Sequence, residues 1–178
     1  MSKILMAFET WSGATRGVAE EIARVLSNDG ADVKVVRARD VERIEDYDAV
    51  IIGASVHAGQ IPRPLKRLVK QNADALAKKP LAYFVVCFTM NEDTPENRET
   101  ARGYLKPLEE AAPDAKPVDV GLFAGAALDE GEDYRRLLPP LKLPVKAMSK
   151  SVGDRRDWEA IRTWAAQLGP KLGTTTRD

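Results

Sequence analysis

The sequence contains only one cysteine and one histidine among its 178 residues. A single cysteine, Cys87, excludes an intramolecular disulfide, which is typical of a protein in a reducing cytosol. One cysteine and one histidine are also too few for a zinc site built from protein ligands. No apolar run approaches the roughly 18 residues of a membrane-spanning helix, and the N-terminus shows no signal-peptide pattern. These absences predict a cytoplasmic protein without a metal centre.

The sequence also lacks net charge, because its 27 basic and 27 acidic residues cancel. A chain without an excess of basic residues has no overall attraction to nucleic acid, and none is predicted as a partner. The hydrophobic share of 44% is ordinary for a globular protein. We expect residues 1–172 to form a single domain and residues 173–178 to form a disordered tail.

Apolar runs alternate with helical patterns along the chain. The runs are continuous, as in Val50-Ile51-Ile52, which is typical of strands buried on both faces of a parallel sheet. Strands are predicted at residues 3–8, 32–37, 48–53, 81–88 and 118–123. The pattern therefore predicts an α/β architecture: a doubly wound five-stranded parallel sheet with helices on both faces. In such a sheet, ligands bind beyond the carboxyl ends of the strands.

Capping residues and apolar stripes mark the expected helices. The first helix is predicted over residues 14–28 and is ended by Asn28-Asp29-Gly30. Thr94 and Pro95 form a helix start, with the hydroxyl as N-cap and the proline in the first helical position. Other helices are predicted after Asp40 (a short one), from about Pro64, and over residues 157–168.

The most informative segment is the turn between the first strand and the first helix, Thr10-Trp11-Ser12-Gly13-Ala14-Thr15. Its three hydroxyls surround a glycine at a helix N-terminus, where free N–H groups and the helix dipole attract an anion. The turn has no lysine, unlike a nucleoside-triphosphate loop, and it lacks the three glycines of a dinucleotide loop. The remaining interpretation is that the turn binds a monophosphate, such as the phosphate of FMN. The alternative is a helix cap formed by Ser12 or Thr15, and Trp11 either contacts a partner or packs on its own loop.

This turn resembles the (Thr/Ser)-x-(Thr/Ser)-Gly-x-Thr phosphate loop of flavodoxins. A second segment, residues 53–59, resembles the flavodoxin loop that holds the flavin ring. Two further segments, Ala124-Gly125-Ala126-Ala127-Leu128 and Asp157-Trp158-Glu159, are similar to one branch of the family, the menaquinone-dependent protoporphyrinogen IX dehydrogenases. The resemblance covers nearly the whole chain and implies a flavodoxin-like fold for the α/β sheet, with FMN as the cofactor.

Three loops would hold FMN under this resemblance. They comprise Thr10, Trp11, Ser12, Gly13, Ala14 and Thr15; then Ala54, Ser55, Val56, His57, Ala58 and Gly59; and finally Cys87, Phe88, Thr89, Met90 and Asn91. The resemblance implies that His57 lies beside the flavin ring, and the Asn91 amide is expected at the polar edge of the ring. The alternatives are an ordinary strand-to-helix loop, a surface histidine and an inert buried Cys87 thiol. No catalytic residue is predicted.

The resemblance further implies an enzyme that passes electrons from a porphyrinogen through FMN to a quinone. The alternative is a flavodoxin that carries electrons between a reductase and an acceptor protein, without catalysis. Flavodoxin carriers are usually strongly acidic, so the zero net charge favours the enzyme.

Residues 129–156 form a long insert before the last helix, and long connections are often functional. Its three prolines, at positions 139, 140 and 144, are expected to forbid a continuous helix. Leucines interleave with basic residues, which suits a lid, pairing with substrate carboxylates, or contact with the inner face of the cell membrane. A solvated loop is the alternative. Because the three flavin loops lie elsewhere in sequence, FMN binding is expected to be independent of the insert.

Overall fold

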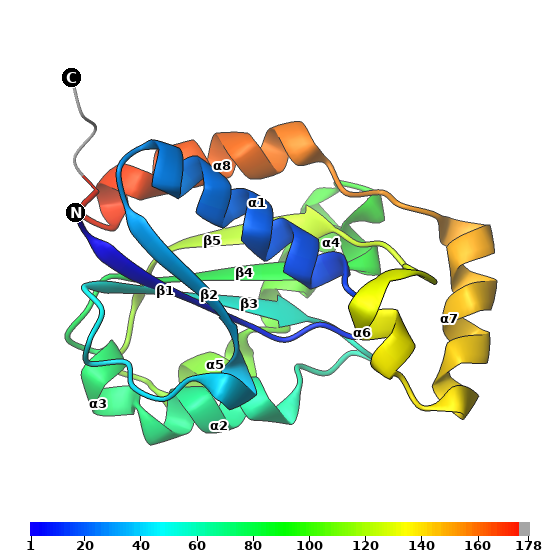
Figure 1. Cartoon of the computed structure of the whole chain (residues 1–178), viewed down its shortest axis with the longest axis horizontal. Helices are drawn as coiled ribbons and strands as arrows, with labels where there is room; N and C mark the ends of the chain where they lie inside the picture. Colours follow the sequence, from blue (N-terminus) through cyan, green and yellow to red (C-terminus); the bar gives the residue numbers. More distant parts are fainter. Residues whose placement is uncertain (175–178) are drawn as a thin grey trace.

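Five parallel strands form one sheet in the computed structural model, which describes residues 1–174. Their order across the sheet is β2-β1-β3-β4-β5 (Figure 1). The strands are β1 (Lys3–Phe8), β2 (Asp32–Arg37), β3 (Ala49–Ser55), β4 (Leu81–Cys87) and β5 (Pro117–Ala124). The predicted fold class is confirmed. All five strands lie where they were predicted, and no strand end is more than two residues from its predicted position.

Helices cover both faces of this sheet (Figure 1). One face packs against α1 (Ala14–Asn28) and α8 (Trp158–Lys171). The other packs against α2 (Arg63–Gln71), α3 (Ala73–Leu76), α4 (Pro95–Gly103) and α5 (Lys106–Ala111). Every residue of the two central strands β3 and β4 is buried, which explains their continuous apolar sequences.

The N-cap residues of α4 and α8 form the hydrogen bonds that begin these helices, at the positions that the sequence predicts. Thr94 Oγ1 accepts a hydrogen bond from the Asn97 N–H at 3.1 Å, and Asp157 Oδ1 accepts one from the Ala160 N–H at 3.0 Å. The bounds of α1 agree with the prediction, whereas α8 continues past residue 168 to Lys171. The short helices α3 and α5 were not predicted.

Two local predictions were wrong. The helix expected after Asp40 is instead a single 3-10 turn, η1 (Ala38–Asp40), that ends there; Val41 is extended and Ile44 is fully buried in the core. The tail was predicted to be disordered from residue 173, but the Thr174 N–H donates to the Gly169 carbonyl at 3.1 Å and the residue is buried. The rest of that predicted tail, residues 175–178, lies outside the described residues.

The insert forms two helices, α6 (Gly131–Arg136) and α7 (Pro139–Val152), which lie beyond the carboxyl ends of the strands (Figure 1). The chain does break before Pro139, and Pro139 and Pro140 occupy the first turn of α7, where a missing N–H is tolerated. Pro144, however, lies inside α7, so the expectation that it would interrupt the helix was wrong. Within residues 1–174, the helices lack the combination of length and apolar character that crossing a membrane requires.

Candidate functional site

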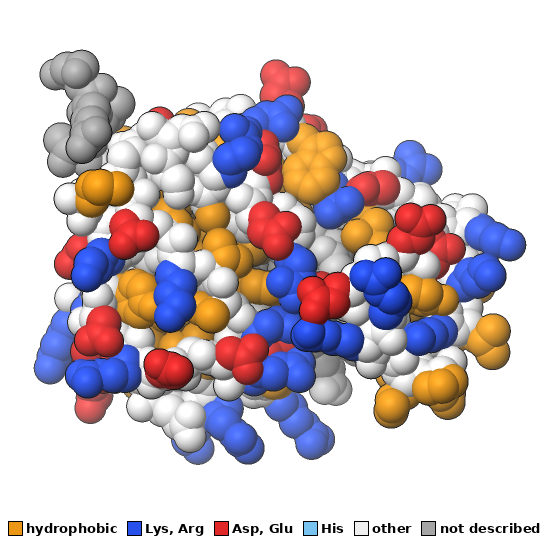
Figure 2. Space-filling view, viewed as in Figure 1, with side chains coloured by type: hydrophobic (Ala, Val, Ile, Leu, Met, Phe, Trp, Pro, Cys, Tyr) orange, Lys and Arg blue, Asp and Glu red, His pale blue; other side chains and the backbone are white. Residues whose placement is uncertain are grey.

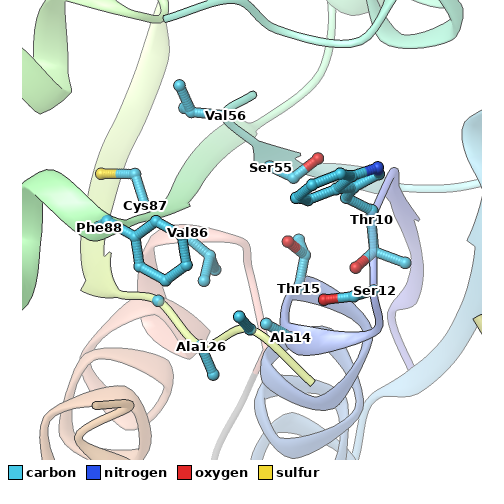
Figure 3. A pocket seen from close by; sticks show the side chains of 13 residues that line it. Thr10, Ser12, Ala14, Thr15, Ser55, Val56, Val86, Cys87, Phe88 and Ala126 are labelled. Atoms are coloured by element: carbon cyan, nitrogen blue, oxygen red, sulfur yellow. The ribbon is translucent and has the colours of Figure 1, made fainter. Parts of the chain in front are cut away.

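A cleft opens at the carboxyl edge of the sheet (Figure 3). Loops that follow four strands contribute to it, because the carboxyl ends of parallel strands meet at one edge. Its lining residues are Thr10, Trp11, Ser12, Ala14 and Thr15 after β1; Ser55 and Val56 at the end of β3; Val86, Cys87 and Phe88 at the end of β4; and Gly125, Ala126 and Ala127 after β5. The phosphate turn and parts of the two predicted ring loops therefore meet in one cleft.

The turn after β1 is held in shape by its own hydroxyls. Thr10 Oγ1 accepts a hydrogen bond from the Gly13 N–H at 3.0 Å, and Gly13 adopts a left-handed conformation with φ of 109°. Ser12 Oγ accepts from the Leu128 N–H at 3.2 Å, which ties the turn to the loop after β5. No side chain caps α1, so the alternative prediction that Ser12 or Thr15 is a helix cap was wrong. The buried Thr15 lines the cleft at the start of the helix.

Trp11 and His57 join the first two loops. Their ring centroids lie 4.2 Å apart at an interplanar angle of 33°. His57 is exposed and does not line the cleft, whereas Trp11 does, so the histidine supports the tryptophan from outside. Ala58 and Gly59 lie at the tip of a tight turn closed by hydrogen bonds between His57 and Gln60, and both have positive φ, 48° and 72°.

The loop after β4 presents only its first two residues to the cleft. Cys87 is buried, and burial raises the pKa of its thiol, as expected for an unreactive cysteine. Phe88 begins a 3-10 turn, η2 (Phe88–Asn91), in which Thr89 hydrogen-bonds to Tyr104 and Met90 enters the core. Asn91 Oδ1 accepts from the Gly125 N–H at 3.1 Å, so this side chain braces the loop after β5 rather than lining the cleft.

Four lining residues were not predicted as part of the site: Val86, Gly125, Ala126 and Ala127. Gly125 has a clear structural requirement, since a Cβ there would lie 3.1 Å from the Cys87 carbonyl carbon. The signal that would have found the loop is topological: β5 ends at the same edge as the other strands. Ala54, predicted in the ring loop, is instead a fully buried residue of β3.

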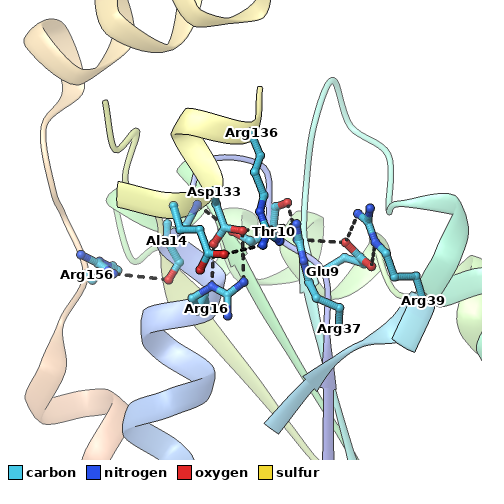
Figure 4. Close-up of polar contacts among 11 residues, drawn as sticks. Glu9, Thr10, Ala14, Arg16, Arg37, Arg39, Asp133, Arg136 and Arg156 are labelled. Carbon is cyan, nitrogen blue, oxygen red and sulfur yellow. Dashed lines mark hydrogen bonds and ion pairs between the residues drawn. The ribbon is translucent and has the colours of Figure 1, made fainter. Parts of the chain in front are cut away.

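A cluster of five charged residues lies beside the phosphate turn (Figure 4). Glu9 and Asp133 are 2% and 4% exposed, so both carboxylates are removed from water. Arg37 lies between them, 3.1 Å from a Glu9 oxygen and 3.3 Å from an Asp133 oxygen. Arg39 contacts Glu9 at 3.1 Å, and Arg16 contacts Asp133 at 2.6 Å. The cluster thus connects β1, β2, α1 and α6.

The arginines compensate for the burial of these carboxylates. Burial of Asp133 opposes its ionisation, but the hydrogen bond from Arg16 and the charge of Arg37 outweigh burial and lower the pKa of Asp133. Arg16 and Arg37 also lie over the Phe8 ring, 5.1 and 5.8 Å from its centroid. Sequence reasoning missed this cluster, because its members are distant in the chain and follow no local pattern.

Comparisons with known proteins agree with this geometry. The sequence pattern of the flavodoxin domain matches residues 5–137. A protein of Escherichia coli K12 named protoporphyrinogen IX dehydrogenase [quinone] is 28% identical over 177 residues, which cover 93% of this chain and 94% of that protein.

Two solved structures share the fold. Oxidised flavodoxin 1 of Bacillus cereus is 20% identical with a TM-score of 0.57, and the match covers 97% of each chain. A Lactobacillus acidophilus flavoprotein in complex with FMN is 19% identical with a TM-score of 0.51, over 68% of this chain and 93% of that one. With the family pattern spanning β1 to α6 and the cleft at the edge where these strands end, the chain belongs to the flavodoxin domain family.

Proposed function

We propose that this chain binds FMN in the cleft at the carboxyl edge of its sheet. The single observation that carries the proposal is the hydroxyl-rich turn at the N-terminus of α1, which lines that cleft without any lysine. Polar groups gather at the α1 side and apolar ones at the opposite side, as a ligand with a phosphate and a flat ring requires (Figure 3).

The phosphate of FMN would lie against the turn, beside Ser12, Thr15 and the first N–H groups of α1. Trp11 and Phe88 are the aromatic side chains among the lining residues, and Phe88 is 36% exposed, so both are available to pack on the flavin ring. His57 and Asn91 have an indirect role in this proposal, because His57 packs on Trp11 and Asn91 accepts a hydrogen bond from Gly125, and both of these partners line the cleft. When bound, FMN supplies the capacity to accept and release reducing equivalents.

We further propose that the chain oxidises a porphyrinogen and delivers the electrons to a quinone. The name of the Escherichia coli relative supports this activity, and the match covers nearly the full length of both proteins. In this proposal the protein binds and orients the reactants beside the cofactor, and the side chains that line the cleft exclude water from it. The second candidate, an electron carrier between proteins, is favoured by the shared fold with Bacillus cereus flavodoxin.

Anaerobic mixing distinguishes the two functions. The protein loaded with FMN should lose its flavin absorbance on addition of protoporphyrinogen IX and regain it on addition of a soluble quinone analogue. A carrier would instead be inert to protoporphyrinogen and be reduced by a flavodoxin reductase. Protein that binds no FMN after reconstitution, or that prefers FAD, would rule out the cofactor and with it both functions.

We also propose that α7 contacts an anionic membrane surface, where a lipid-soluble quinone is available. Leu138 and Leu143 are 69% and 74% exposed, which is unusual for large apolar side chains. Leu138 directly precedes α7, Lys142 and Lys146 lie on α7 with Leu143, and Figure 2 shows apolar and basic side chains gathered at this end of the molecule. Leucines that enter the interface and lysines that meet lipid phosphates are a suitable combination for peripheral binding.

Sedimentation with lipid vesicles checks this surface. The protein should sediment with phosphatidylglycerol vesicles and much less with neutral phosphatidylcholine vesicles. Replacing Leu138 and Leu143 together with serine should weaken binding about tenfold or more, because two leucines no longer enter the apolar layer. Val118→Ser is the matched control, since Val118 is 42% exposed but lies on β5, away from α7. Equal sedimentation of the double variant and the wild type would exclude α7 as the contact.

A further inference from the structure

Asp133 is a buried carboxylate supplied by the insert, and it faces the phosphate turn rather than solvent. It lies on α6 and is 4% exposed. Its Oδ2 accepts a hydrogen bond from Arg16 Nε at 2.6 Å, and Arg16 belongs to the first turns of α1. The start of α1 is therefore connected to α6 by a short ion pair between residues 117 positions apart.

Arg37 extends this connection into the turn itself. Its guanidinium contacts Asp133 Oδ1 at 3.3 Å and donates to the Thr10 carbonyl at 3.2 Å (Figure 4). The same guanidinium pairs with Glu9 at 3.1 Å. One arginine thus joins the residue at which the phosphate turn begins to a carboxylate of the insert.

The insert also packs directly on the glycine of the turn. A Cβ added to Gly13 would lie 3.6 Å from Leu128 Cδ1 and 3.7 Å from Asp133 Oδ2. In addition, the Leu128 N–H is the donor to Ser12 Oγ. The turn is therefore held from behind by the chain segment that enters the insert, while its other side lines the cleft.

From these contacts we propose that Asp133 is a positioning residue for the phosphate turn, so that cofactor binding and order in α6 are coupled. The proposal rests on the proposed binding of FMN. A buried charge that loses its partners is costly, so a displacement of Asp133 from Arg16 and Arg37 is opposed. Coupling between two sites is reciprocal. If the contacts from α6 raise the affinity for FMN, bound FMN stabilises the folded α6 by the same free energy. The expectation that the insert is independent of FMN rested on sequence separation and does not take this contact into account.

The test combines FMN affinity with hydrogen exchange in α6. In the wild-type protein, saturation with FMN should slow amide exchange over residues 131–136 about fivefold or more. Asp133→Asn should weaken FMN binding about tenfold, measured by fluorescence titration, and should remove most of the FMN-dependent protection. Glu132→Gln is the matched control, because Glu132 neighbours Asp133 on α6 but pairs with Arg136 on the surface.

The outcomes separate the coupling from simpler effects. A structural role alone would raise exchange equally with and without FMN, leaving the FMN-dependent difference unchanged, and would overturn the proposal. Tighter FMN binding by Asp133→Asn would also overturn it, since that result follows from removing a negative charge near an anion. If Asp133→Asn does not fold, the wild-type arm still decides: unchanged α6 exchange on FMN binding refutes the coupling. A wild type that binds no FMN refutes the proposed function itself.

Discussion

Thr15→Glu is expected to abolish FMN binding. Thr15 is 1% exposed and lines the cleft in the first turn of α1, so a glutamate there has little room to turn away. Its carboxylate would face the phosphate, and the turn contains no lysine to offset the added charge. Like charges about 4 Å apart at an effective dielectric of about 20 repel by about 4 kcal/mol, which corresponds to a loss of about a thousandfold in affinity.

Fluorescence titration of the apoprotein with FMN measures this loss. Thr15→Ser is the matched control, because it keeps the hydroxyl and should bind FMN within about tenfold of the wild type. Circular dichroism of both variants checks that the fold is intact. A glutamate variant that binds FMN as tightly as the serine variant would place the phosphate elsewhere.

Gly53→Ala is expected to cause a large loss of stability. Gly53 lies in β3 directly opposite Phe84 of β4, and a Cβ there would lie 2.1 Å from Phe84 Cζ. The Phe84 ring is fully buried and packs against the Phe123 and Trp164 rings, so a shift of the ring would disturb close-packed neighbours. We expect a loss of about 3 kcal/mol, which lowers the melting temperature by about 10 °C in a domain of this size.

Thermal melting of two variants tests this packing argument. Gly103→Ala is the control, because a Cβ at Gly103, the last residue of α4, would meet nothing within 4 Å. That substitution should leave the protein as stable or raise its stability by about 0.5–1 kcal/mol, since alanine is a better helix former. Similar melting temperatures for Gly53→Ala and Gly103→Ala would show that the sheet tolerates a methyl group between β3 and β4.

Sequence patterns alone located the five strands, the helices α1, α2, α4 and α8, and the edge at which the cleft lies. Continuous apolar runs located β3 and β4 because both faces of these strands are buried. The Thr94 cap located α4 because it acts within four residues. The hydroxyl-rich turn could be placed at the cleft because every strand of a parallel sheet ends at the same edge.

Which residues of each loop enter the cleft depends on how the loops pack against one another in three dimensions. Phe88 lines it while Met90, two residues later, enters the core, and no periodic pattern in a 3-10 turn distinguishes the two. Trp11 and His57 stack because two loops converge. The pairing of Asp133 with Arg16 and Arg37 likewise depends on how α6 folds back over the turn. Local propensities and caps act over a few residues, whereas these contacts join side chains far apart in the chain, so they exist only once the sheet and its loops are assembled.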